Sequence, residues 1–243
     1  MRQDVFEIVS NRNLAPNVYE MVLRGSSTGD CTPGRFVQLK MDSFYLRRPI
    51  SVCDAEEGKL TLVYKTVGRG TEAMAQYESG KRIDVLTGLG NGYDLDKSGD
   101  RPLLIGGGAG VPPMYLLTRR LLAQGKQPTV ILGFNKAEKI FYEEQFRALG
   151  IKTIIATADG SVGVKGFVTD AMEGLDYTYT YACGPEPMLK AVYNRAATSG
   201  EYSFEERMGC GFGACMGCTC ETKYGNKRIC KDGPVLTKEE IVW

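Results

Sequence analysis

Five of the eight cysteines lie close together near the C-terminal end of the chain: Cys210, Cys215, Cys218, Cys220 and Cys230. Four residues separate Cys210 from Cys215, two separate Cys215 from Cys218, and eleven separate Cys218 from Cys230. This is the spacing of plant-type [2Fe–2S] loops, in which four thiolates bind two irons. The intervening glycines allow the backbone to curl around such a cluster and to point N–H groups at its sulfurs. We therefore expect Cys210, Cys215, Cys218 and Cys230 to bind a [2Fe–2S] cluster.

Two other interpretations of these cysteines remain open from the spacing. A structural zinc site with four cysteines commonly uses two closely spaced pairs, and the second pair is missing here. Unliganded thiols are the other alternative. Cys220 is left over, and because it follows Cys218 by two residues it would share the side of a strand with that ligand. We expect Cys220 to fill space, with exchange for a ligand as the alternative.

The chain contains no histidine, which removes several kinds of chemistry. A Ser-His-Asp triad, a Cys-His pair, a histidine-ligated zinc or haem and a Rieske centre are excluded. Thirty basic and twenty-nine acidic side chains give a net charge of +1, without the basic excess of proteins that neutralise nucleic-acid phosphates. No membrane-spanning run and no secretory signal pattern is found. We expect a cytoplasmic protein that binds neither nucleic acid nor membrane.

A second group of residues suggests a flavin site in the N-terminal half. Arg47-Arg48-Pro49-Ile50-Ser51 is followed by Val63-Tyr64-Lys65 and by Gly68-Arg69-Gly70-Thr71. An arginine offers a two-pronged donor to a pyrophosphate. A glycine before a helix that begins at Thr71 would present free N–H groups to the same phosphates. Each segment alone is typical of an ordinary turn, so the prediction depends on their occurring together.

A glycine-rich segment, Gly106 to Pro112, follows a predicted strand and opens a predicted helix. That context is the one a dinucleotide site requires, although Val111 occupies the place of the last glycine in G-x-G-x-x-G. A close-packed turn is the alternative. Cys183-Gly184-Pro185 ends a later strand, at the sheet edge that faces the ligand crevice. Cys183 is predicted either to be a buried apolar residue or to contact a nicotinamide.

The surrounding sequence indicates three structural units. Up to residue 98, short alternating strands predict an antiparallel β-barrel, with a helix at 71–77 capped by Thr71. Residues 101–200 alternate strands with helices, the latter expected at 112–123, 137–149, 167–172 and 187–198, which predicts a parallel α/β sheet. Residues 203–243 are too few to build a core alone. The fold class is therefore a multidomain β plus α/β protein with a small iron–sulfur unit.

The order of these motifs resembles the ferredoxin–NADP reductase superfamily and, within it, the electron-transfer subunits of NAD-dependent class 1B dihydroorotate dehydrogenases. The resemblance covers essentially the whole chain. Its most specific stretches are 47–51, 106–114, 159–166, 205–210 and 230–234. The small subunits of NADH-dependent ferredoxin–NADP reductases look similar but have aspartate in place of the first cysteine, so Cys210 argues against them.

The resemblance implies three cofactor sites. FAD would be bound by Arg48, Pro49, Ile50, Ser51, Val63, Tyr64, Lys65, Gly70 and Thr71. NAD(H) would approach Gly107, Gly108, Ala109, Gly110, Val111, Pro112, Cys183, Gly184 and Pro185. The [2Fe–2S] cluster would be held by the four cysteines already named. Lys136 could also accept a 2′-phosphate, so the residues alone leave NAD and NADP open and the resemblance favours NAD.

The resemblance also implies a division of labour with a partner. An FMN-containing catalytic subunit would oxidise dihydroorotate in pyrimidine biosynthesis, and the two kinds of subunit would form a heterotetramer. This chain would conduct electrons to NAD⁺ without catalytic residues of its own. Phe212 and Met216 could form the docking surface or could pack around the cluster. The alternatives are a flavin and iron–sulfur NAD(P)H reductase subunit of a ferredoxin- or sulfide-linked complex, and a non-enzymatic zinc-stabilised adaptor.

Overall fold

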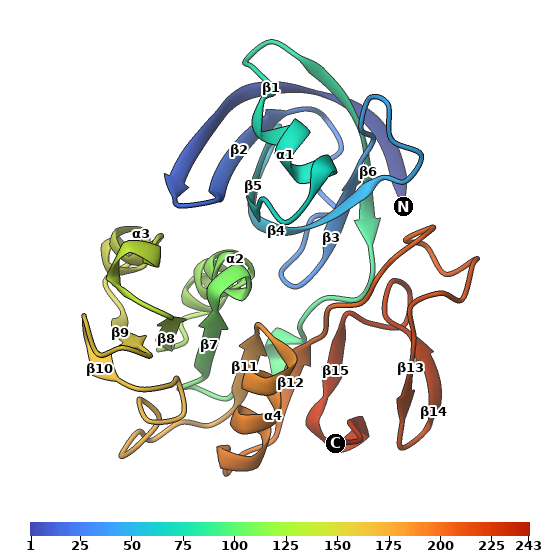
Figure 1. Ribbon diagram of the computed structural model, residues 1–243. Coiled ribbons are helices and arrows are strands. Elements are labelled where there is room, and N and C mark those ends of the chain that lie inside the picture. Colours follow the sequence, from blue (N-terminus) through green and yellow to red (C-terminus); the bar gives the residue numbers. More distant parts are fainter.

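Six strands in the N-terminal part close into an antiparallel barrel in the computed structural model, which describes residues 1–243 (Figure 1). They are β1 (Arg2–Ala15), β2 (Val18–Arg24), β3 (Phe36–Leu39), β4 (Arg48–Glu56), β5 (Lys59–Lys65) and β6 (Arg82–Leu89). Their order is β1-β2-β5-β4-β3-β6, and pairing of β1 with β6 closes the barrel. Helix α1 (Arg69–Ala75) lies in the connection from β5 to β6. The predicted barrel is confirmed.

The second unit is a seven-stranded sheet with the order β10-β9-β8-β7-β11-β12-β15. Its strands are β7 (Leu103–Gly107), β8 (Thr129–Phe134), β9 (Lys152–Thr157), β10 (Val164–Lys165), β11 (Thr180–Cys183), β12 (Gly200–Ser203) and β15 (Val235–Thr237). All neighbouring strands are parallel except β12 and β15. The α/β fold class is confirmed, and β15 shows that the cysteine-rich segment completes the sheet.

Each face of this sheet is covered by a different set of elements (Figure 1). Helices α2 (Val111–Ala123) and α3 (Glu143–Ala148) lie on the face toward the barrel, and one core joins them to barrel residues such as Val18 and Val63. Helix α4 (Glu186–Arg195) lies on the other face, whose core also contains Cys218 and Cys230. The cysteine-rich unit therefore shares its core with the α/β unit.

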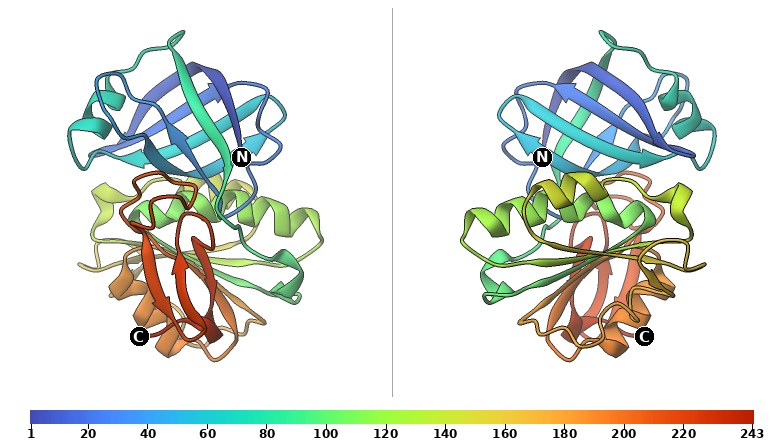
Figure 2. Two further views of the ribbon diagram at one scale, coloured as in Figure 1. Left: turned by 90° about the vertical axis from the view of Figure 1, so that its right-hand side faces the viewer. Right: turned by 90° about the vertical axis from the view of Figure 1, so that its left-hand side faces the viewer.

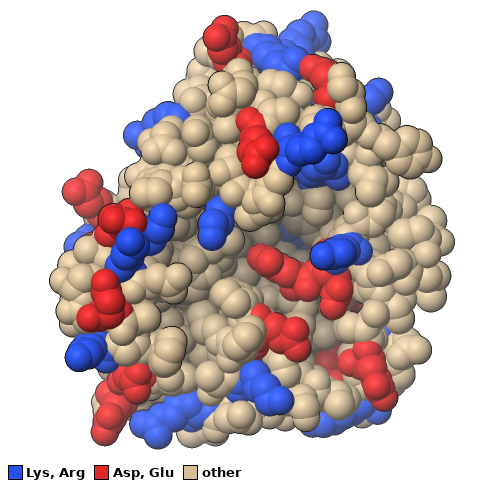
Figure 3. All heavy atoms as spheres, viewed as in Figure 1, with Lys and Arg blue, Asp and Glu red and all other residues tan.

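The cysteine-rich unit adds a hairpin of β13 (Thr219–Thr222) and β14 (Gly225–Arg228) beside the sheet. Figure 2 shows the barrel above the α/β layer and this hairpin at its side. On the face drawn in Figure 3, basic and acidic side chains are interspersed, and the surface is hollowed between the barrel and the layer below. No helix has both the length and the apolar character needed to cross a membrane.

Three local predictions are wrong. Thr71 does not cap α1, because the helix begins earlier, after Gly68, and the Thr71 hydroxyl instead donates to the Gly68 carbonyl at 3.0 Å. The helix expected at 137–149 is split into a 3-10 turn (Ala137–Lys139) and α3, since Tyr142 takes a left-handed conformation with φ 66°. No helix forms at 167–172, where the Asp170 carboxylate accepts a hydrogen bond from the Phe167 N–H and stabilises a turn.

Candidate functional site

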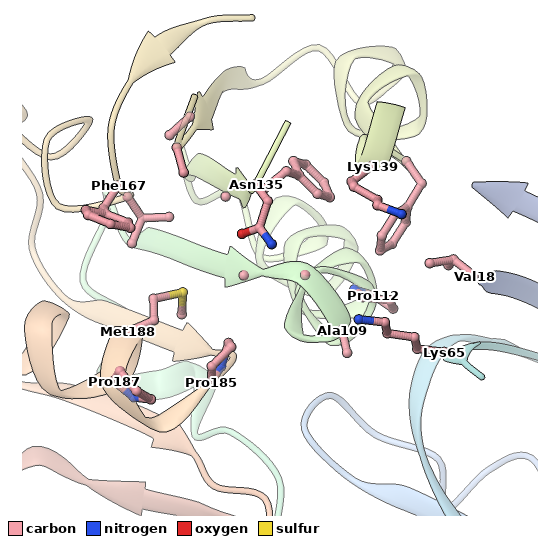
Figure 4. A pocket seen from close by; sticks show the side chains of 18 of the residues that line it. Val18, Lys65, Ala109, Pro112, Asn135, Lys139, Phe167, Pro185, Pro187 and Met188 are labelled. Carbon is pink, nitrogen blue, oxygen red and sulfur yellow. The ribbon is translucent and has the colours of Figure 1, made fainter. Parts of the chain in front are cut away.

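A cavity of about 600 Å³ lies between the barrel and the carboxyl ends of the parallel strands, where open α/β sheets bind their ligands. Val18, Val63, Tyr64 and Lys65 form its barrel wall. The opposite wall comes from the loops after β7, β8 and β9 and from the start of α4. Figure 4 shows Val18 and Lys65 on one side of this cavity and Phe167 and Met188 across it.

The glycine-rich segment packs tightly against the loop that follows β11. A Cβ atom on Gly110 would lie 2.0 Å from the Cys183 carbonyl oxygen, and one on Gly107 would lie 2.2 Å from the Met188 sulfur. The backbone contact excludes a side chain at Gly110, whereas a side chain at Gly107 would require the flexible end of Met188 to move. Helix α2 then begins with prolines in its first turn and without a side-chain cap. Pro112 and Pro113 have no N–H group and the N–H of Val111 donates to the Gly108 carbonyl, so the start of α2 does not present a set of free donors.

The predicted nucleotide residues divide between the cavity wall and the layer beneath it. Gly107, Gly108, Ala109, Pro112 and Pro185 line the cavity. Gly110 and Val111 are buried beneath it, and Gly184 lies against Met188. Cys183 is 3% exposed and its pKa is raised to about 12 by burial, so its thiol is protonated and held in the core at the strand end.

Sequence reasoning missed several cavity residues that come from loops after the strands: Asn135, Lys139, Phe141, Phe167, Thr169 and Met188. Asn135 could have been found, because it directly follows β8 at the ligand-binding edge. Lys136 is not among the lining residues and instead pairs with Glu138 at 2.9 Å. Two lysines line the cavity, Lys65 from the barrel and Lys139, which lies 3.8 Å from the same carboxylate.

On the barrel side, two segments that are separate in the sequence come into direct contact. The Arg48 guanidinium packs against Gly70 so closely that a Cβ there would lie 2.1 Å from Arg48 Nε. Its NH1 donates to the Leu46 carbonyl at 2.6 Å, and its charge lies 4.9 Å from the centre of the Phe44 ring. The uncapped start of α1 and the arginine thus form one anion-binding surface, which fits the pyrophosphate of FAD.

Tyr64 is held by the barrel in a fixed orientation at the edge of the cavity. Its hydroxyl donates to Asn11 Oδ1 at 2.9 Å, and its ring stacks on Tyr19 with the centroids 5.8 Å apart. Asn11 in turn donates to the carbonyls of Met74 and Tyr77. Burial raises the pKa of Tyr64, so the hydroxyl remains a donor. The ring is 4% exposed and belongs to the barrel core, so Tyr64 holds the end of β5 in place at the cavity edge.

The four predicted metal-binding thiols form two pairs. Cys210 contacts Cys215, and Cys218 contacts Cys230. No three His, Cys, Asp or Glu side chains are grouped around the position of a single metal ion. The backbone N–H of Ala214 donates to Cys210 Sγ at 3.2 Å, and that of Cys230 donates to Cys218 Sγ at 3.4 Å. Two pairs of sulfurs with N–H donors are a donor set that fits two irons.

The two pairs differ in their electrostatic surroundings. Burial raises the pKa of Cys210, but N–H donors from residues 212, 214 and 215 outweigh burial and lower it to about 6. Burial and the neighbouring Cys218 raise the pKa of Cys230 to about 12. Cys220 is half-buried, and burial raises its pKa as well. The N–H donors around Cys210 therefore favour its thiolate form.

Comparison with known families identifies two domains in the chain. A family described as the iron-sulfur cluster binding domain of dihydroorotate dehydrogenase B matches residues 205–242, and the oxidoreductase NAD-binding domain matches residues 104–194. The dihydroorotate dehydrogenase B (NAD(+)) electron transfer subunit of Bacillus pumilus is 44% identical, over 99% of this chain and 98% of its own length. That of Bacillus cereus is 42% identical, over 100% and 99%.

Solved structures give the same picture of the fold. The structure of an NADH-dependent reduced ferredoxin-NADP oxidoreductase, described in a study of flavin-based electron bifurcation, has a TM-score of 0.90 at 29% identity, covering 98% of this chain and 90% of that one. A cytochrome P450 reductase from Amycolatopsis shares the fold at a TM-score of 0.71 and 22% identity, covering 80% and 66%. From its full-length identity to curated relatives, the chain belongs to the family of dihydroorotate dehydrogenase B electron transfer subunits.

Proposed function

We propose that this chain carries electrons from the FMN of a partner dihydroorotate dehydrogenase subunit to NAD⁺, in pyrimidine biosynthesis. The observation that carries the proposal is that three sites adjoin one another. The cavity is shared by the α/β unit and by barrel residues Val63 to Lys65, and the cysteine loop reaches the outer face of barrel strand β3, where Gly211 contacts Gln38. A chain built only to bind NAD would not need this second junction.

Three sets of residues support three bound groups. The four cysteines would hold a [2Fe–2S] cluster, the segments 48–51, 63–65 and 70–71 would hold FAD, and the segments 107–112 and 183–185 would receive NAD(H). When bound, a nicotinamide exchanges a hydride, an iron–sulfur cluster exchanges single electrons, and a flavin can do both. In space, the proposed flavin residues lie between the other two sites. Residues 63–65 line the cavity, and Pro49 pairs with Gln38, which contacts the cluster loop.

The protein's own contribution is to hold and orient these groups. Arg48 and the start of α1 would bind the FAD pyrophosphate, and Tyr64, through its bond to Asn11, would hold the end of β5 in place beside the flavin. Gly107 and Gly108 line the cavity, and Gly110 allows the start of α2 to pack against the loop after β11. Backbone N–H groups at Ala214 and Cys215 would stabilise the charge on the sulfur ligands.

Oxidation of dihydroorotate itself would take place in the partner subunit, as the heterotetramer of the family implies. This chain has no histidine, and its three buried carboxylates, Glu20, Glu201 and Glu240, each accept hydrogen bonds from within the chain. Phe212 and Met216 are 46% and 54% exposed on the cluster loop, so we propose that they contact the partner. All eight cysteines are free thiols, which supports a reducing, cytoplasmic location.

The test is to co-purify the chain with its native partner and to measure NADH formation from dihydroorotate. We expect the complex to reduce NAD⁺ with dihydroorotate as the donor, and the isolated chain to fail to do so. A complex that reduces NAD⁺ only with reduced ferredoxin or sulfide would contradict the proposal. That result would favour the alternative role as a reductase subunit of a ferredoxin- or sulfide-linked complex. The similarity in fold to a ferredoxin-NADP oxidoreductase is the observation behind this alternative.

A further inference from the structure

Gln38 occupies an outward-facing position on barrel strand β3. Val37 and Leu39 point inward and belong to the barrel core. Phe36 points the other way, into the core that the sheet shares with Cys218 and Cys230. Because side chains alternate along a strand, Gln38 points to the same side as Phe36, toward the cysteine-rich unit.

The side chain of Gln38 lies between the proposed flavin strand and the proposed cluster loop. In the sheet register, Gln38 is directly opposite Pro49 on β4. On the other side it meets Gly211, where a Cβ atom would lie 1.9 Å from Gln38 Nε2. Gly211 has φ +77° and directly follows Cys210. The glycine thus leaves the carboxamide in contact with the loop that carries the cysteines.

Both polar atoms of this carboxamide are buried and have no hydrogen-bond partner in the protein. The residue is only 1% exposed. A buried amide without a partner is destabilising, and native structures contain few such groups. The arrangement therefore indicates a partner that the chain itself does not supply.

We propose that the Gln38 carboxamide donates a hydrogen bond to the bound [2Fe–2S] cluster and raises its reduction potential. The proposal rests on the proposed function, because it requires the cluster to be present. One-electron reduction adds one negative charge to a cluster. An N–H donor near the sulfurs stabilises that charge more than it stabilises the oxidised state, which is how hydrogen bonds tune such potentials.

The direct test is an EPR-monitored redox titration of the intact complex carrying Gln38→Met, which removes the amide at nearly unchanged volume. We expect the reduction potential of the cluster to fall by ~59 mV. For one electron, this corresponds to a tenfold lower ratio of reduced to oxidised cluster at a fixed ambient potential. The flavin potentials should not move. Thr87→Val is the matched control, because Thr87 is also buried and unpartnered but points into the barrel.

An unchanged cluster potential in Gln38→Met would overturn the proposal, and so would a shift confined to the flavins, which would assign the amide to FAD. A second measurement does not depend on a variant that folds. In wild-type complex labelled with ¹⁵N in the glutamine side chain, pulsed EPR of the reduced cluster should detect coupling to ¹⁵N, and its absence would overturn the proposal. Protein that contains no iron and sulfide would instead contradict the proposed function.

Discussion

The Tyr142 hydroxyl donates a hydrogen bond of 2.7 Å to the carboxylate of Glu20 and so ties the α/β unit to the barrel. Tyr142 directly precedes α3, and its neighbour Phe141 lines the cavity. Glu20 lies on β2, two residues after Val18, which lines the opposite wall. Arg12 Nε lies 2.7 Å from the other oxygen of Glu20. The bond therefore fixes the separation of the two cavity walls.

Replacing Tyr142 with phenylalanine should loosen this junction. A hydrogen bond to a charged group contributes about 1.5–3 kcal/mol, and we expect part of that to appear as an increase in KM for NADH of roughly 3–10-fold with kcat unchanged. Steady-state NADH oxidation with an artificial electron acceptor measures both constants. Tyr115→Phe is the control, because the Tyr115 ring lies 5.3 Å from that of Tyr142. An unchanged KM in Tyr142→Phe would show that the bond to Glu20 does not position the cavity walls.

Arg48→Met should release FAD. The variant removes the guanidinium that packs on Gly70 at the start of α1, and loss of a charge-assisted hydrogen bond to a phosphate corresponds to roughly a tenfold to hundredfold weaker affinity. The FAD content after gel filtration measures the effect. Arg47→Met is the matched control, because Arg47 pairs with Asp84 at 2.9 Å within the barrel. Equal loss of FAD from both variants would show a general defect of the barrel.

The preference for NADH over NADPH should depend on Glu138. Its carboxylate lies 2.9 Å from Lys136 and 3.8 Å from Lys139, which lines the cavity. Glu138→Gln would free both lysines to attract a 2′-phosphate. Because the pair is exposed, we expect a modest gain, with the KM for NADPH about 2–5-fold lower. Adding Lys136→Gln and Lys139→Gln should remove the gain, and a fall in the KM for NADH of the same size would argue against phosphate recognition.

Glu201 should make stability depend on pH. Burial raises its pKa to about 7, although the Asp94 N–H and Lys97 favour the charged form. A carboxyl whose pKa is higher in the folded state destabilises the fold as the pH rises from about 4.5 to about 7. The cost above this interval is at most about 3 kcal/mol. Glu201→Gln should therefore melt about 5 °C higher than wild type at pH 8 and equally at pH 4.5. A lower melting temperature of the variant at pH 8 would show that the ion pair with Lys97 dominates.

The sequence predicts the architecture well where local periodicity and tertiary structure agree. Strand β8 (Thr129–Phe134) and strand β9 (Lys152–Thr157) have the predicted bounds, because continuous apolar runs between helices are typical of buried parallel strands. The helix expected at 137–149 fails for a tertiary reason. Phe141 packs against Phe134 and Tyr142 bonds to Glu20, and these contacts outweigh the helical preference of the segment.

For the site, the sequence predicts residues that belong to compact motifs. The cysteine spacing, the glycine-rich segment and Arg48 all belong to short stretches whose chemistry is evident from residue type. Phe167, Met188 and Lys139 line the same cavity but come from separate loops, so only the fold brings them together. Gln38 is undetectable from sequence, because nothing in the residues around it indicates that Gly211 will lie against its amide.

The central claim is that electrons from dihydroorotate reach NAD⁺ through the cluster on this chain. The most direct measurement compares two variants, Cys215→Ala and Cys220→Ala, each in complex with the partner subunit. Cys215 is a proposed ligand, and Cys220 is the spare cysteine two residues beyond Cys218. We predict that NADH still reduces the flavin in both variants. Dihydroorotate-dependent formation of NADH should be abolished in Cys215→Ala and retained in Cys220→Ala. Formation of NADH at the wild-type rate by a Cys215→Ala complex that lacks the cluster would contradict the account.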